Sequence, residues 1–153
     1  THQVTLYTSI VTDAMPRAVG NLQGYLDQLP SGREPTKLLV IGDETATTAT
    51  LAELRERFSG RLYITRSLPT FAEVANRECS KGIALAWLAD RLGVAQADTI
   101  AIGDALNDLE MVEWAGMGVA MGNAVPELAA ATGYYTSALE QDGVAEAIER
   151  YLL

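Results

Sequence analysis

The sequence contains 153 residues, of which 48% are hydrophobic and 20% are charged, a composition typical of folded globular proteins. Eleven lysine and arginine residues stand against 20 acidic ones, and the net charge of −9 disfavours nucleic acid and anionic membrane surfaces as partners. An anionic substrate would therefore need a local cation. The longest apolar runs, such as residues 37–41, are far shorter than the roughly 18–20 residues of a membrane span, which argues against a membrane protein.

The first half of the chain mixes strand and helix patterns. Alternating or continuous apolar residues predict strands at residues 4–10, 37–41, 61–65 and 71–74. Helical periodicity predicts helices at residues 14–29 and 47–58. Within the first of these helices, Pro16 suits only the first turn, and Gly20 and Gly24 weaken helical propensity.

The second half follows a more regular order. Ser80 is a candidate N-cap for a helix at residues 82–92, and Gly93 is a C-terminal stop signal. Strands at residues 99–102, 119–121 and 134–136 then alternate with helices at residues 108–115, 126–131 and 144–152. This alternation predicts an α/β fold with a parallel sheet. We place a domain boundary after residue 76, which divides the chain into residues 1–76 and 77–153.

The strongest local motif follows the predicted strand at residues 99–102. Gly103 allows a tight turn, and Asp104, Asn107 and Asp108 then lie at the carboxyl edge of the sheet, where α/β proteins bind ligands. Two carboxylates at one crevice suit Mg²⁺, a hard cation that prefers oxygen ligands. The alternative is that Asp108 only caps or charges the first turn of the following helix.

Three further residues have a functional and a structural interpretation. Lys81 stands at a helix start, where the helix dipole disfavours a cation, so it is either a phosphate-binding group or an exposed surface lysine. His2, the single histidine, is interpreted as a solvated terminal residue, which leaves no Ser-His-Asp triad and no histidine-rich zinc site. Cys79, the single cysteine, is interpreted as a small buried residue. Because it cannot form an intramolecular disulfide, and the N-terminus shows no signal-peptide pattern, we expect a cytoplasmic protein.

Segments of the second half follow one another in a recognisable order and spacing: Ser80-Lys81-Gly82, Ile102-Gly103-Asp104-x-x-Asn107-Asp108, Gly122-Asn123-Ala124 and Asp142-Gly143-Val144. Taken together, these motifs resemble the haloacid dehalogenase superfamily, and more narrowly the Cof-type phosphatases with a large α/β cap. It implies that residues 77–153 form the C-terminal half of a Rossmannoid parallel sheet and that residues 1–76 form part of the cap.

The family resemblance also implies residue roles in a Mg²⁺-dependent phosphatase that works through an aspartyl-phosphate intermediate. Lys81 would contact phosphate, and Asn107 would contact phosphate or orient the site. Asp104 would be a direct metal ligand, and Asp108 would support the metal directly or through water. Asn123 is a weaker candidate that would support the metal ligands from outside.

One family feature is missing from the sequence. The nucleophile and the general acid/base of the family lie in an Asp-x-Asp-Gly-Thr-like segment, and neither Asp13 nor Asp43 stands in such a context. We therefore expect a fragment of a phosphatase of small phosphorylated metabolites, such as sugar phosphates, that is inactive alone and self-associates through a sheet edge. The alternatives are a non-catalytic binding or regulatory module, and a phosphomutase.

Overall fold

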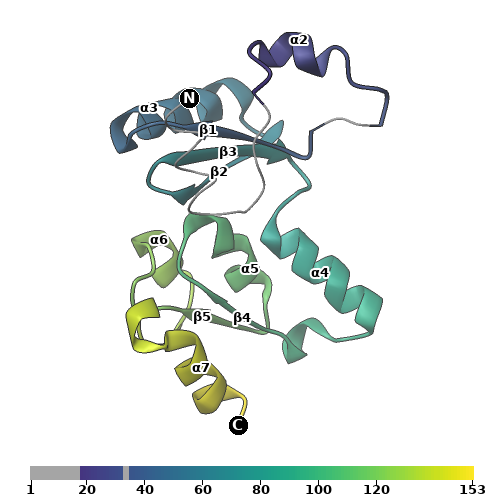
Figure 1. The fold of residues 1–153 in the computed structure, drawn as a ribbon. Coiled ribbons are helices and arrows are strands. Elements are labelled where there is room, and N and C mark those ends of the chain that lie inside the picture. The colour runs from purple at the N-terminus through teal and green to yellow at the C-terminus, as the bar shows by residue number, and fades with distance from the viewer. Residues whose placement is uncertain (1–17, 33–34) are drawn as a thin grey trace.

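A computed structural model describes residues 18–32 and 35–153 (Figure 1). Two sheets lie one above the other, one formed by the first half of the chain and one by the second (Figure 1). The strand predicted at residues 4–10 lies outside the described residues, as does His2. Within the described ranges, no helix is both long and apolar enough to cross a bilayer.

The helix predicted at residues 14–29 is much shorter in the described part. Only α2 (Leu22–Leu26) is helical there. Gly20 adopts a left-handed conformation with φ of 67°, which a continuous α-helix does not accommodate. Asn21 then caps α2, because its side chain accepts a hydrogen bond from the Gly24 amide.

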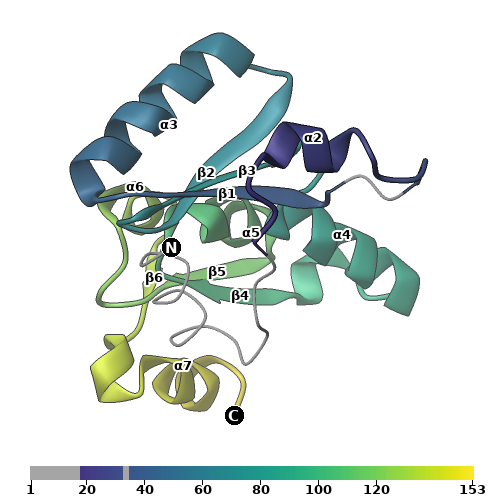
Figure 2. The ribbon, with the colours of Figure 1, turned by 45° about the horizontal axis from the view of Figure 1, so that its top comes forward.

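The first sheet is antiparallel, with the strand order β1-β3-β2. It consists of β1 (Lys37–Ile41), β2 (Leu62–Leu68) and β3 (Phe71–Asn76), close to the predicted strands. The face turned away from the second sheet is covered by α3 (Glu44–Phe58) (Figure 2). The opposite face therefore looks toward the second sheet.

Helix α3 begins three residues before the predicted start at residue 47. Its N-cap is Asp43, whose side chain accepts a hydrogen bond of 2.8 Å from the Ala46 amide. Thr47 and Leu51 are buried against the sheet. Asp43 thus has a local structural role, which agrees with its interpretation as a residue outside the catalytic motifs.

Helix α4 (Lys81–Leu92) links the two sheets and has the caps that the sequence predicts. The Ser80 hydroxyl accepts a hydrogen bond of 3.2 Å from the Ile83 amide. Gly93 ends the helix in a left-handed conformation with φ of 68°. β3 ends at Asn76 and α4 starts at Lys81, and the division between residues 76 and 77 remains our proposal.

The second sheet is parallel, as predicted, with the order β4-β5-β6. Its strands are β4 (Ile100–Gly103), β5 (Met117–Ala120) and β6 (Tyr134–Tyr135). Its helices are α5 (Leu109–Trp114), α6 (Pro126–Ala129) and α7 (Gly143–Tyr151). α5 lies on the side that faces the first sheet and α7 on the opposite side (Figures 1 and 2). The fold is therefore α/β.

A small apolar core supports the second sheet from the side of α5. Val112, Ala120 and Leu128 are buried together there. Short 3₁₀ turns at Gln96–Asp98, Leu106–Asp108 and Leu139–Gln141 connect the elements. This core places the loops at the carboxyl ends of β4 and β5 beneath the first sheet.

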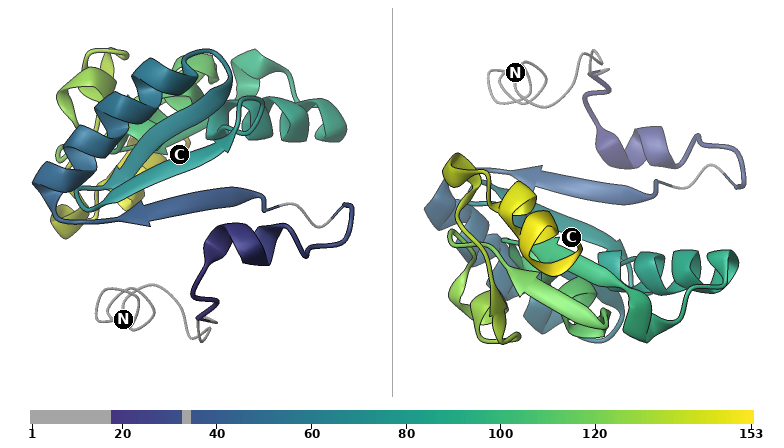
Figure 3. Two further views of the ribbon diagram at one scale, coloured as in Figure 1. Left: turned by 90° about the horizontal axis from the view of Figure 1, so that it is seen from above. Right: turned by 90° about the horizontal axis from the view of Figure 1, so that it is seen from below.

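The edges of both sheets are visible from above and from below in Figure 3. α2 lies beyond the edge strand β1, on the side opposite to β2 and β3 (Figure 3). In the part of the chain that the structure describes, β4 and β6 are the edge strands of the parallel sheet. Self-association through such an edge remains a proposal.

Candidate functional site

A buried carboxylate shapes the turn at the carboxyl end of β4. Asp108 is only 6% exposed, and its Oδ2 accepts hydrogen bonds of 3.2 Å from the amides of Asp104 and Ala105. Gly103 is required beside it, because a Cβ at this position would lie 2.5 Å from the Asp108 Cβ. The motif Gly103-Asp104 therefore depends on Asp108, and the three residues form one structural unit.

Lys81 reaches the same carboxylate from the start of α4. Its Nζ donates to Asp108 Oδ1 in a short ion pair that joins residues 27 positions apart. This pair explains how a cation is tolerated at a helix N-terminus, since the carboxylate compensates the unfavourable interaction with the helix dipole. Asp108 accepts one of the three ammonium protons, and the others are available to a ligand.

Asp104 is oriented by a residue from the loop that follows β5. Asn123 Nδ2 donates a hydrogen bond of 2.8 Å to Asp104 Oδ2, and Asn123 Oδ1 accepts one of 3.0 Å from the Leu139 amide. The Asn123 side chain therefore bridges Asp104 and the Leu139–Gln141 turn. The structure thus places Asn123 beside Asp104, and the supporting role that the family resemblance implies for Asn123 remains a proposal.

A pocket of about 340 Å³ lies between the first sheet and this cluster. From the second half of the chain, Lys81 and Asn107 line it. From the first sheet, the lining residues include Lys37, Tyr63 and Glu73. Four of the five predicted site residues thus form one connected network around Asp108 and Asp104, and the fifth, Asn107, lines the adjoining pocket with Lys81.

The first sheet contributes polar side chains that the sequence analysis missed. Glu73 accepts hydrogen bonds from the Ser67 hydroxyl and from Lys37 Nζ, the latter at 3.0 Å. Burial is the largest cause that raises the pKa of the Tyr63 hydroxyl, and nearby carboxylates raise it further. The alternation of Tyr63 with Thr65 in β2 was the available signal, because a period of two places both on one face.

The interpretation of Cys79 as a buried residue is wrong. Its side chain is exposed and lines the pocket. The cause is local: Cys79 lies in the turn between β3 and α4, where its amide donates to the Asn76 carbonyl oxygen at 3.0 Å. This turn keeps the residue at the surface rather than in the core.

The carboxylates at the end of β4 are compatible with a magnesium ion. Asp108 is engaged with Lys81 and two backbone amides, whereas Asn123 occupies only Oδ2 of Asp104. Asp104 can therefore supply a ligand oxygen. No group of three His, Cys, Asp or Glu side chains able to hold a metal occurs among the described residues. Mg²⁺ often uses one or two carboxylates and completes its shell with waters and phosphate oxygens, so the Asp104 carboxylate fits as one ligand of such an ion.

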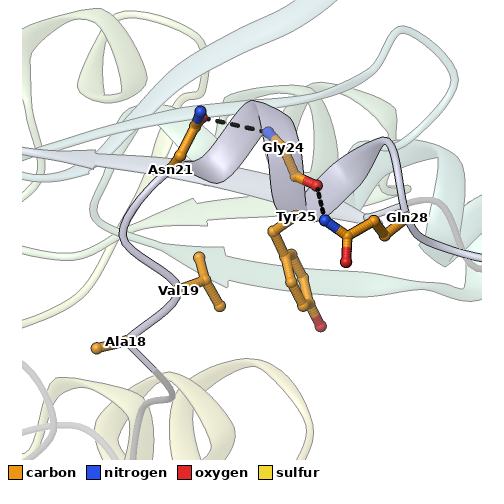
Figure 4. A pocket seen from close by; sticks show the side chains of 6 residues that line it. All are labelled: Ala18, Val19, Asn21, Gly24, Tyr25 and Gln28. Carbon is orange, nitrogen blue, oxygen red and sulfur yellow. Dashed lines mark hydrogen bonds between the residues drawn. The ribbon is translucent and has the colours of Figure 1, made fainter.

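A second pocket, of about 500 Å³, lies beside α2 (Figure 4). Its lining contains no charged residue and comprises Ala18, Val19, Asn21, Gly24, Tyr25 and Gln28. The Asn21 and Gln28 side-chain amides are both hydrogen-bonded to the backbone of Gly24. We therefore do not assign an anion site to this pocket.

The fold and the site define an α/β protein whose polar cluster lies between a parallel sheet and an antiparallel sheet. The family model described as haloacid dehalogenase-like hydrolase matches residues 16–148. The chain therefore belongs to the haloacid dehalogenase-like hydrolases.

Particular relatives extend this assignment. The chain is 40% identical over 113 residues to 5-amino-6-(5-phospho-D-ribitylamino)uracil phosphatase YcsE of Bacillus subtilis, covering 74% of this chain and 45% of the relative. It is 38% identical over 105 residues to HMP-PP phosphatase of Cronobacter sakazakii, covering 69% of this chain and 38% of the relative. A solved haloacid dehalogenase-like hydrolase from B. subtilis superposes with a TM-score of 0.72 at 29% identity, covering 88% of this chain and 46% of the solved chain. The chain thus spans less than half the length of these relatives.

Proposed function

We propose that this site binds the phosphate group of small phosphorylated metabolites in a Mg²⁺-dependent phosphatase. The observation that carries the proposal is the Lys81–Asp108 pair, which holds an ammonium group at the carboxyl end of β4 beside Asp104. Relatives named as phosphatases of a phosphoribityl compound and of HMP-PP support this substrate class.

Each residue of the cluster has a proposed role. Lys81 and Asn107 bind and orient the phosphate oxygens, and Lys81 offsets their charge. Asp104 binds Mg²⁺, which when bound would neutralise phosphate charge. Asp108 supports the metal site by holding Lys81 and the turn that carries Asp104, and Asn123 orients the Asp104 carboxylate.

The proposed reaction proceeds through an aspartyl-phosphate intermediate. In the intact enzyme, the carboxylate of the missing nucleophile segment attacks phosphorus and displaces the ester oxygen, which takes its proton from the general acid; water then hydrolyses the acyl phosphate and releases inorganic phosphate. Asp43 is committed to the cap of α3, and Asp104 and Asp108 to the network described above. We therefore propose that the chain by itself binds phosphate without turnover.

Titration of the chain with inorganic phosphate in the presence of Mg²⁺ tests this function. We expect saturable binding that Lys81→Met weakens by about tenfold or more, because a charge-assisted hydrogen bond is lost. Asp104→Asn should remove the dependence on Mg²⁺. Arg91→Met is the matched control, because it removes the same charge about 15 Å along α4. Binding that is unaffected by Lys81→Met would refute the assignment.

Phosphate release distinguishes the proposed enzyme from a binding module. Release from p-nitrophenyl phosphate should be absent for this chain with or without Mg²⁺. Turnover by the chain would contradict the proposed inactivity and show that it contains its own nucleophile. A binding or regulatory module is favoured instead if phosphate binds with equal affinity to the wild type and to Asp104→Asn.

A further inference from the structure

The two lysines of the sequence, Lys37 and Lys81, line the same pocket. They come from different sheets and lie 44 positions apart in the chain, Lys37 in the edge strand β1 and Lys81 at the start of α4. The pocket volume of about 340 Å³ lies within the usual range for small-molecule sites. Both lysine side chains therefore adjoin the space that one small ligand would occupy.

Each lysine is held by one carboxylate in the same way. Lys37 Nζ donates to Glu73 Oε2 at 3.0 Å, and Lys81 Nζ donates to Asp108 Oδ1. A second contact anchors each carboxylate, since Glu73 also accepts from Ser67 and Asp108 also accepts from backbone amides. The ammonium groups of both lysines are thus positioned by carboxylates that have other hydrogen bonds of their own.

In both ion pairs the lysine side chain is more exposed than the carboxylate that holds it. The side chains of Lys37 and Lys81 are 51% and 48% exposed, whereas those of Glu73 and Asp108 are 13% and 8% exposed. The cations are therefore more accessible than their carboxylates, and each ammonium keeps two further N–H donors for a ligand. Each pair is neutral overall, and the accessible end of each pair is its ammonium group.

We propose that the pocket selects phosphate monoesters that carry a second anionic group, with the phosphate at Lys81 and the second anion at Lys37. This inference rests on the proposed function, because it takes Lys81 as the phosphate-binding residue. Glu73 is a positioning residue that holds Lys37. The second anionic group is a carboxylate or another phosphate, since a lysine binds either as a point charge.

Two phosphate monoesters of similar size, which differ in whether they carry a second anionic group, show the effect of that group on affinity. 3-Phosphoglycerate carries a phosphate and a carboxylate, and glycerol 3-phosphate carries a hydroxymethyl group in place of the carboxylate. We expect the wild-type chain, titrated by calorimetry with Mg²⁺ present, to bind 3-phosphoglycerate about tenfold more tightly than glycerol 3-phosphate.

Charge-neutral double variants make this test specific. Lys37→Met/Glu73→Gln removes one cation and one anion, and it should abolish the preference by lowering 3-phosphoglycerate affinity to that of glycerol 3-phosphate. Asp90→Asn/Arg91→Met removes the same charges from the exposed end of α4 and should keep the preference. Lys37→Arg should also keep it, because the positive charge remains. Circular dichroism confirms that each variant is folded.

The outcomes separate this inference from the proposed function. Equal binding of the two probes by the wild type overturns the inference and leaves the phosphate site at Lys81 intact. A preference that survives Lys37→Met/Glu73→Gln also overturns it. Failure of both probes to bind overturns the phosphate site and the inference together, whereas Lys81→Met should weaken both probes alike.

Discussion

The two sides of the pocket are built differently. On the side of the parallel sheet, Asp108 is buried, bonded to two backbone amides and packed against Gly103. On the side of the antiparallel sheet, Glu73 is held by two side chains, Ser67 and Lys37. The position of Asp108 is therefore set by the backbone turn. The position of Glu73 depends on individual side chains, each of which can be substituted separately.

This difference suggests a division of labour. Asp108 is held by two backbone amides, so the loss of a single side-chain partner does not release it, which suits its proposed role as the fixed partner of Lys81. A polar face held by side-chain pairs can be altered without disturbing a turn, which suits discrimination between substrates. Substitutions on the parallel-sheet side should therefore weaken phosphate or metal binding, and substitutions on the antiparallel-sheet side should leave both unchanged.

The largest effect is expected from Gly103→Ala. The added Cβ would lie 2.5 Å from the Asp108 Cβ, so the turn must shift and carry Asp104 with it. We expect the free energy of unfolding in urea to fall by about 2 kcal/mol, and phosphate binding to weaken in parallel. Gly133→Ala is the control, because no atom lies within 4 Å of a Cβ there. If Gly103→Ala changed neither the free energy of unfolding nor phosphate binding, the proposed rigidity of the turn at the parallel sheet would be contradicted.

A smaller and more selective effect is expected from Asn123→Ala. Asp104 loses its hydrogen bond of 2.8 Å, and the Leu139 amide loses its acceptor. Mg²⁺ affinity, measured by calorimetry, should fall by about tenfold, because supporting residues orient metal ligands. Asn21→Ala, which removes an asparagine cap from α2, should leave Mg²⁺ affinity unchanged. An equal loss in both variants would contradict a specific role for Asn123.

The smallest effect is expected from Ser67→Ala on the antiparallel sheet. Glu73 keeps Lys37 but loses one hydrogen bond, so the free energy of unfolding should fall by about 1 kcal/mol. Phosphate affinity should remain at the wild-type value, in contrast to Gly103→Ala. The exposed Ser59→Ala is a matched control for stability. A clear loss of phosphate binding in Ser67→Ala would contradict the proposal that the antiparallel sheet does not determine phosphate affinity.

Much of the fold could be predicted because its signals are local. The N-cap Ser80, the stop at Gly93 and the parallel order of the later strands agree with the structure. Two local interpretations failed where neighbouring residues decided the outcome. Gly20 and Asn21 confine α2 to a short segment, and a turn exposes Cys79.

The candidate site was only partly readable from the sequence. The motif from Gly103 to Asp108 identified the carboxyl edge, because glycine and carboxylates stand a few positions apart in one turn. Lys37 and Glu73 carry no such signal, since a lysine and a glutamate in strands usually indicate a solvated face. Their link to Lys81 requires the packing of two sheets from distant segments.

By itself, the sequence determined the α/β class, the helix caps and the residues around Asp104, because periodicity and capping act over a few neighbouring positions. Only the tertiary structure decided that Lys81 pairs with Asp108, that Asn123 supports Asp104 and that Lys37 shares their pocket. These contacts join segments 19 to 44 positions apart, and they form only when strand pairing and helix packing bring the segments together.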